Sequence, residues 1–189
     1  MPALIRPRTA LVVIDLQRGF FATPVLAAQA ARVVDATNEL LRRGAARGVP
    51  IFIVRTVHAV DRSTWTLSML ADDQGFNFPG TPEVELLDGL VVPPGSHDVV
   101  KIRDSAFHGT DLAQRIRLLG VTRLLVCGVE AENCVALTGR DAFAHDLEVA
   151  FAVEAIASGH LERGNRALAD NRTEVRQRLL THAEVDGWW

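Results

Sequence analysis

A net positive charge and long apolar runs are absent from this sequence of 189 residues, and cysteine is scarce. Lysine and arginine together number 20 against 23 aspartate and glutamate residues, which gives a formal net charge of -3. A chain without a basic field has little electrostatic attraction for nucleic acid or for an anionic membrane surface, so we expect neither partner. No apolar run approaches the roughly 20 residues that a transmembrane helix needs. These absences leave a globular protein with a small-molecule partner as the expected class.

The two cysteines, Cys127 and Cys134, make a poor disulfide pair because they lie close in the sequence. One falls in a predicted strand and the other at a predicted helix start. Free cysteines fit a reducing compartment, so we expect a cytoplasmic location. Residues 1–8 lead straight into an apolar strand and lack the cleavage site of a signal peptide, which agrees with that expectation.

Short aliphatic runs alternate along the chain with segments whose apolar residues have helical spacing. This alternation predicts an α/β fold, a doubly wound domain built on a parallel sheet. The predicted strands are residues 9–15, 50–56, 97–102, 124–127, 148–153 and 178–181, with the last at a sheet edge. The predicted helices are residues 24–47, 111–119, 134–145 and 161–173. No repeat or linker interrupts the pattern, so we expect one domain over residues 1–189.

Residues 57–94 break this pattern, because glycine, proline, aspartate and aromatic residues replace the periodic apolar ones. A loop of this length inside a compact domain is usually functional, so we expect it to form one wall of a pocket and to set the substrate. Residues 83–87 have the composition of a helical turn. The chain ends in Trp188 and Trp189, which we expect to be exposed, an arrangement unusual on a monomer.

Three polar residues stand at or just past the ends of predicted strands: Asp15, Lys101 and Cys134. In an open α/β sheet, functional groups gather at the carboxyl ends of the strands, and a reversal of strand order would bring the first and fourth strands together. We therefore expect the three side chains to share one crevice. Taken singly, each has a plain structural alternative: a helix-capping aspartate, a surface lysine and a small buried cysteine.

Together these residues have the chemistry of a cysteine nucleophile. The positive end of the helix at Cys134 and the Lys101 ammonium would both favour the thiolate. Asp15 can accept the thiol proton and later return it to a leaving amine. Backbone N–H groups at the corner before Cys134 are natural donors to the oxyanion that forms when the thiolate attacks a carbonyl carbon.

Three segments in this order resemble the isochorismatase-like cysteine hydrolases, a family that includes nicotinamidases, N-carbamoylsarcosine amidase and ureidoacrylate or biuret amidohydrolases. The segments are residues 13–20 (VIDLQRGF), Lys101 with residues 105–112 (SAFHGTDL), and residues 128–135 (GVEAENCV) with residues 140–143 (RDAF). Each segment is weak evidence alone, and the three together are specific. The resemblance covers nearly the whole chain and implies a three-layer fold with a six-stranded parallel sheet.

The resemblance also assigns roles to individual residues. It implies a catalytic triad of Asp15, Lys101 and Cys134, and a cis peptide bond between Val129 and Glu130. It implies further that the backbone N–H groups of Glu130 and Cys134 form an oxyanion hole.

Metal-dependent nicotinamidases carry an Asp-x-His motif after the second strand, whereas the matching residues here are Thr56, Val57 and His58. One histidine does not make a metal site, so we expect neither metal nor cofactor. The isochorismatases proper, which cleave a vinyl ether, lack the cysteine. By resemblance, Cys134 therefore indicates hydrolysis of a C–N bond.

The remaining candidates concern the walls of the pocket. We expect Phe20, His58, Trp65 and Phe107 to line it, with core or lid packing as the alternative for the aromatic residues and an ordinary loop position for His58. Cys127 is expected in the core. Glu130 and Asn133 flank the proposed nucleophile and either face substrate or satisfy the backbone of the corner, and Arg140 and Asp141 are expected to form structural ion pairs.

We therefore interpret the chain as a hydrolase of a small amide, ureido or carbamoyl compound that acts through a thioester. The resemblance and the terminal tryptophans favour a homodimer or homotetramer. Two alternatives remain open: a vinyl-ether hydrolase of the isochorismatase type, and a non-catalytic oligomeric member of the fold. The sequence does not name the substrate.

Overall fold

The computed structural model describes residues 8–189, so the predicted absence of a leader at residues 1–7 lies outside the described residues. Six strands form a single sheet in the order β3-β2-β1-β4-β5-β6, and every neighbouring pair is parallel. The strands are β1 (Thr9–Ile14), β2 (Ile51–Thr56), β3 (His97–Lys101), β4 (Arg123–Gly128), β5 (Glu148–Ile156) and β6 (Arg178–Leu180). The order reverses between β1 and β4, which confirms the predicted doubly wound α/β fold.

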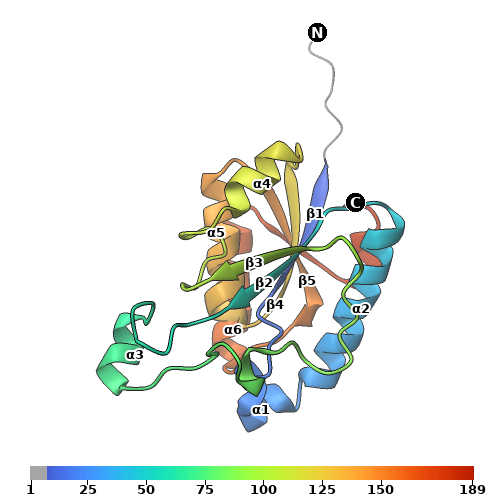
Figure 1. Cartoon of the computed structure of the whole chain (residues 1–189). Helices are drawn as coiled ribbons and strands as arrows, with labels where there is room; N and C mark the ends of the chain where they lie inside the picture. Colours follow the sequence, from blue (N-terminus) through green and yellow to red (C-terminus); the bar gives the residue numbers. More distant parts are fainter. Residues whose placement is uncertain (1–7) are drawn as a thin grey trace.

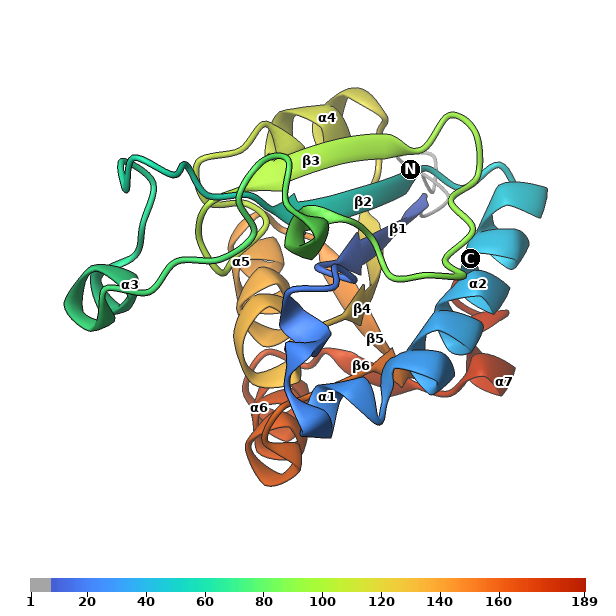
Figure 2. The ribbon, with the colours of Figure 1, turned by 60° about the horizontal axis from the view of Figure 1, so that its bottom comes forward.

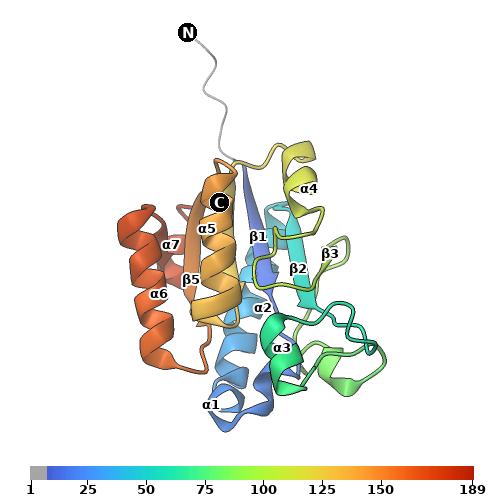
Figure 3. The same cartoon turned by 90° about the vertical axis from the view of Figure 1, so that its left-hand side faces the viewer.

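Helices cover both faces of the sheet, so the molecule has three layers (Figures 1 and 2). On one face lie α2 (Ala30–Ala46) and α7 (His182–Val185); on the other lie α4 (Leu112–Leu118), α5 (Ala136–Ala144) and α6 (Leu161–Glu174). Figure 3 shows α5 and α6 in front of the sheet and α2 behind it. All six residues of β1 are buried, as expected for a central strand covered on both sides. No helix within residues 8–189 is both long and apolar enough to cross a bilayer.

The helix predicted over residues 24–47 is in fact two helices, α1 (Pro24–Ala27) and α2. The chain turns between them at Gln29. The side-chain amide of Gln29 donates to the carbonyl oxygens of Val25 and Ser158, both at 2.9 Å, and so ties the turn to the segment after β5. This long-range bond accompanies the break, and apolar spacing alone does not reveal it.

The long segment after β2 extends away from the sheet and carries the short helix α3 (Leu67–Asp72) (Figure 1). The Thr66 hydroxyl caps this helix by accepting a hydrogen bond from the Met69 N–H at 3.3 Å. A 3-10 turn spans Pro82–Val84, next to the predicted turn over residues 83–87. The segment is therefore irregular, as predicted, apart from one capped helix.

The prediction that the terminal tryptophans are exposed is wrong for Trp188. This side chain is 3% exposed, and its indole N–H donates to the Leu124 carbonyl oxygen at 3.2 Å. The guanidinium groups of Arg123 and Arg178 lie 4.9 and 5.4 Å from its ring centroid. Trp189 is half-buried and packs against the core. The terminal aromatics are therefore no argument for association, and a homo-oligomer remains a prediction.

We predict that Trp188→Ala lowers the free energy of unfolding by about 3–5 kcal/mol, because it leaves a cavity and removes the indole hydrogen bond to the Leu124 carbonyl of β4. Leu118→Ala, at a side chain that is 78% exposed, is the control. It should change the free energy of unfolding by no more than about 0.5 kcal/mol. Urea denaturation followed by far-ultraviolet circular dichroism measures both, and equal losses for the two variants would contradict the docking of Trp188.

Candidate active site

Three adjacent strands deliver Asp15, Thr56 and Lys101 to one crevice at the carboxyl edge of the sheet. Asp15 directly follows β1 and has a left-handed backbone with φ of 54°, a conformation that few residues other than glycine adopt. Thr56 and Lys101 are the last residues of β2 and β3 and are paired in register. Cys134 reaches the crevice from the corner that follows β4.

These side chains form one connected buried group. The Lys101 ammonium Nζ lies 2.7 Å from Asp15 Oδ2 and donates to Cys134 Sγ at 3.3 Å. It also donates to the Thr56 hydroxyl at 2.7 Å, and that hydroxyl in turn donates to Asp15 Oδ1 at 2.9 Å. The predicted neighbours therefore do lie together, with Thr56 as a bridge between the two charges.

Burial and charge fix the protonation states of this group. Desolvation, followed by the negative charge of Asp15, raises the pKa of the Cys134 thiol well above its ordinary value, although Lys101 opposes the shift. Burial alone would lower the pKa of Lys101, but the charges of Asp15 and Cys134 and the hydrogen bonds to both together outweigh burial and raise that pKa. Lys101 acts on the thiol in the expected direction, but burial and the Asp15 charge outweigh it and favour a thiol beside the ion pair of Asp15 and Lys101.

The corner before Cys134 has an unusual backbone. The peptide bond between Val129 and Glu130 is cis, and a π-helical turn, Ala131–Val135, leads into α5. The Glu130 carbonyl accepts hydrogen bonds from the N–H groups of Asn133 and Val135, both at 3.1 Å. Within residues 8–189 the Glu130 N–H donates to no other group, so it is available to a ligand.

The flanking side chains satisfy each other and do not point to a separate role. The Asn133 amide donates to Glu130 Oε2 at 3.1 Å. Burial, followed by the neighbouring Glu132, raises the pKa of the Glu130 carboxyl. Arg140 pairs with Glu174 at 2.7 Å, as expected of a structural residue. Cys127 is fully buried in the core, also as predicted, and burial raises the pKa of its thiol to about 12.

A cavity of about 230 Å³ opens onto Cys134 and Lys101. Of the predicted pocket residues, Phe20 and His58 line it. Phe76, not predicted, meets Phe20 edge to face with 5.2 Å between ring centroids. The other lining residues are Thr56, Thr66, Ser68, Met69, Ile102, Arg103 and Asp104.

Two predicted pocket residues lie elsewhere. Trp65 stacks on Phe78 with 5.9 Å between ring centroids, and its indole N–H donates to the Ala59 carbonyl at 2.9 Å. It thus holds its own loop together. Phe107 is buried in the core and packs against His145 in a tilted arrangement with 4.8 Å between ring centroids. Neither ring lines the cavity, and each packs as in the alternative that the sequence left open.

Sequence reasoning also missed residues that hold the site. The Gln17 side chain donates to the carbonyls of Thr56 and Val84 at 3.0 and 2.9 Å and accepts from the Thr56 N–H at 2.8 Å. The rule that selected Asp15 and Lys101, a polar residue ending a buried strand, would have selected Thr56 too. A further signal is that Lys101 is the only lysine in the sequence.

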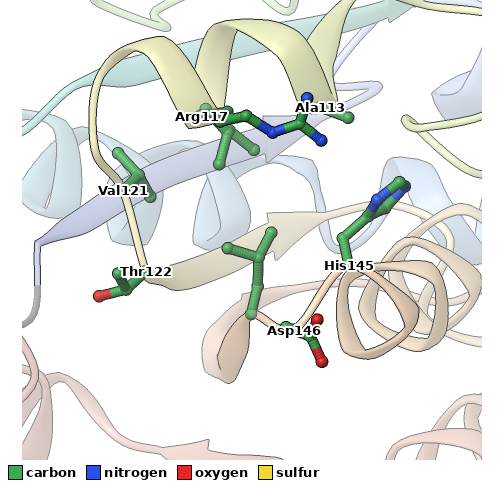
Figure 4. Close-up of a pocket in the computed structure, with 8 residues that line it drawn as sticks. Ala113, Arg117, Val121, Thr122, His145 and Asp146 are labelled. Atoms are coloured by element: carbon green, nitrogen blue, oxygen red, sulfur yellow. The ribbon is translucent and has the colours of Figure 1, made fainter.

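Cavity size alone does not identify the site. A cavity of about 600 Å³ lies beside Trp188. Another of about 160 Å³, shown in Figure 4, lies between α4 and the loops that enter β4 and β5, with Arg117 and His145 on its walls. Neither contains a cysteine, and the second is at the amino edge of the sheet, opposite Cys134. The cysteine and the lysine in its lining therefore make the cavity at Cys134 the candidate active site.

The chain matches the family model described as Isochorismatase domain over residues 9–184. It is 37% identical over 142 residues to a streptothricin hydrolase from Streptomyces noursei, an alignment that covers 74% of this chain and 50% of that protein. The chain thus spans about half the length of that relative. It is also 31% identical over 151 residues to a probable isochorismatase from Pseudomonas chlororaphis, with 79% of this chain and 72% of that protein covered.

Solved structures show the same similarity. An isochorismatase family protein from Desulfovibrio vulgaris superposes with a TM-score of 0.86 at 29% identity, covering 96% of this chain and 98% of that one. The pyrazinamidase of Pyrococcus horikoshii, solved in complex with zinc, superposes with a TM-score of 0.80 at 27% identity, covering 93% and 99%.

The residues of this cavity do not fit a zinc ion. Within residues 8–189 no three histidine, cysteine or acidic side chains cluster as metal ligands would. The Thr56 hydroxyl is occupied by Asp15 and Lys101, and His58 Nδ1 lies 3.1 Å from the Thr64 carbonyl oxygen. The positive charges of Arg103 and Lys101 beside His58 also disfavour a cation.

We predict that Asp15→Asn moves the ionisation of Cys134 to lower pH. The substitution removes a negative charge that disfavours the thiolate and leaves the Lys101 ammonium, which favours it. Titration of the ultraviolet absorbance of the thiolate, with Cys134→Ala subtracted as the blank, gives the midpoint. An unchanged or raised midpoint would show that Asp15 does not act on the sulfur.

Proposed function

The chain belongs to the isochorismatase family of hydrolases, and we propose that it is a metal-independent amidohydrolase that cleaves a C–N bond in a small amide, ureido or carbamoyl compound. The observation that carries the proposal is the buried group of Asp15, Lys101 and Cys134, of which Lys101 and Cys134 line a cavity. In this proposal Cys134 is the nucleophile, Asp15 the general acid and base, and Lys101 the charge that holds both in place.

The protonation states set the first step. The raised pKa of Cys134 favours the thiol at rest, so in this proposal its proton passes to Asp15 as the sulfur attacks the carbonyl carbon of the substrate. Asp15 Oδ2 can take it, because within residues 8–189 this oxygen accepts no hydrogen bond from a backbone group or hydroxyl. Lys101 stabilises the sulfur as it becomes an anion.

The carbonyl oxygen gains a negative charge in this step and needs converging donors. The free N–H of Glu130 is suited to this role, together with the N–H of Cys134. The tetrahedral species collapses when the C–N bond breaks and Asp15 gives its proton to the leaving nitrogen. A thioester and ammonia or an amine result.

Hydrolysis of the thioester closes the cycle. Asp15 accepts a proton from a water molecule as that water attacks the thioester carbon, and the sulfur leaves and regains a proton. The products are the free acid, or a carbamic acid from a ureido substrate, and the original site. Each proton removed is returned to a product or to Cys134, so no other reactant is required.

The names of two relatives support this proposal. A streptothricin hydrolase and a pyrazinamidase stand among them, and the second name denotes cleavage of an amide. The relative named probable isochorismatase supports the second candidate, hydrolysis of a vinyl ether, in which Asp15 would protonate the substrate without help from a thiolate. The Cys134 thiol, which accepts a hydrogen bond from Lys101, favours the amidohydrolase, because cleavage of a vinyl ether would not use a sulfur nucleophile.

We predict that Cys134→Ala lowers kcat/KM for ammonia release at least about a thousand-fold. The matched control is Cys127→Ala, which removes the other thiol from the core and should leave kcat/KM within about three-fold at a temperature where it is folded. A panel of small amides and ureido compounds, assayed for ammonia, supplies the measurement. Full activity of Cys134→Ala on a vinyl ether, with none of the panel cleaved by the wild type, would favour the second candidate.

We also predict that dialysis against a chelator leaves kcat/KM unchanged within about two-fold, because the cavity lacks a set of metal ligands. The assay is repeated after addition of zinc. A loss of activity that zinc restores would contradict the proposed metal-independent mechanism.

A further inference from the structure

Arg103 lies two residues beyond Lys101 and lines the same cavity as Cys134. Its Nη1 donates to the carbonyl oxygens of Thr64 and Ile102 at 2.8 and 2.6 Å. Two carbonyl anchors on one nitrogen fix the plane of the guanidinium. Its Nε and Nη2 donate no hydrogen bond within residues 8–189, so these two nitrogens of the guanidinium can donate to a ligand.

The environment of this guanidinium sets it apart from the other arginines that the structure describes. Nine of them have a carboxylate within ion-pair distance. Among those in residues 8–189 that have none, all are exposed except Arg103, which is half-buried. A half-buried charge without a counter-ion is costly, and a bound anion would relieve that cost.

We propose that Arg103 binds a carboxylate of the substrate, so that the preferred substrates are small amides or ureido compounds that also carry an acid group. The planar fork of an arginine matches the two oxygens of a carboxylate and binds them more tightly than a neutral group. This inference rests on the proposed function, because it takes Cys134 to mark the position of the scissile carbonyl.

Neighbouring charges support this orientation of the substrate. Burial, with the positive charges of Arg103 and Lys101, lowers the pKa of His58, so the imidazole beside Arg103 is neutral and does not add a second cation. Asp104 is exposed on the same wall, and its negative charge acts on Cys134. An acidic substrate would therefore place its carboxylate at Arg103 and turn its neutral carbonyl group toward Cys134.

The test compares pairs of compounds that differ by one charge. N-Carbamoylglycine, N-carbamoyl-β-alanine and succinamate are each paired with the corresponding primary amide, and kcat/KM is measured for wild type, Arg103→Gln and Asp104→Asn. In the wild type at least one acid should exceed its neutral partner, and Arg103→Gln should lower kcat/KM for that acid roughly 10- to 100-fold, mainly through KM. The neutral partner should change by less than about three-fold.

Asp104→Asn is the matched control, because it removes a negative charge where Arg103→Gln removes a positive one. It removes a negative charge from the adjacent position, so KM for the acid should stay the same or fall. Arg103→Lys, which keeps the charge and loses the fork, should restore part of the preference for the acid. Thermal unfolding of each variant shows whether loss of the contacts to Thr64 and Ile102 has unfolded the loop.

Failure of the subsite and failure of the proposed function give different results. If neutral amides are cleaved as well as their acids, or if Arg103→Gln affects both members of a pair equally, Arg103 is not a carboxylate site although the protein is an amidohydrolase. If no compound releases ammonia, the proposed function fails for this panel. Binding of the same pairs to the Cys134→Ala variant, measured by calorimetry, then tests whether Arg103 binds a carboxylate. Equal affinity for acid and amide would overturn the proposal.

Discussion

The ion pair between Asp15 and Lys101 is the constraint on which the rest of the site depends. The Asp15 side chain is 0% exposed and that of Lys101 is 1% exposed, and removing two such charges from water costs several kcal/mol each in real proteins. Their contact and the shared Thr56 hydroxyl offset that cost only if the ends of β1, β2 and β3 stay in register. A shift of one residue in either pairing would turn a buried charge toward the core. The parallel sheet thus serves as the frame that holds two charges together.

The same pair determines the state of the sulfur. Arguments from the helix end and from a nearby ammonium predict a thiolate, yet burial and the Asp15 carboxylate outweigh both. A thiolate would place two negative charges around a single ammonium in a region with little water. With a thiol, the buried group has one charge of each sign and no net charge.

The sequence was enough to predict the fold and the three central side chains, and it failed where partners are distant in the chain. Asp15, Lys101 and Cys134 could be selected because strand ends are readable from apolar runs, and parallel strands end at one edge. Trp188 could not be placed, because its burial depends on docking against Leu124, which lies 64 residues earlier in the chain. Trp65 and Phe107 show the same limit. An aromatic residue in a loop packs against whatever ring the fold brings near, and composition does not identify that ring.

The chemistry and the selectivity of the proposed site come from different parts of the structure, and Arg103 connects them. Asp15, Thr56 and Lys101 sit on strand ends that the core holds fixed, whereas His58, Met69 and Phe76 come from the irregular segment after β2. Arg103 follows β3 and donates to Thr64 in the middle of that segment. Its guanidinium is therefore held by the rigid strand on one side and holds the irregular wall on the other. The Gln17 side chain ties the same segment to the strand ends through its bonds to Thr56 and Val84, so the wall of the cavity is anchored at several points outside the buried ion pair.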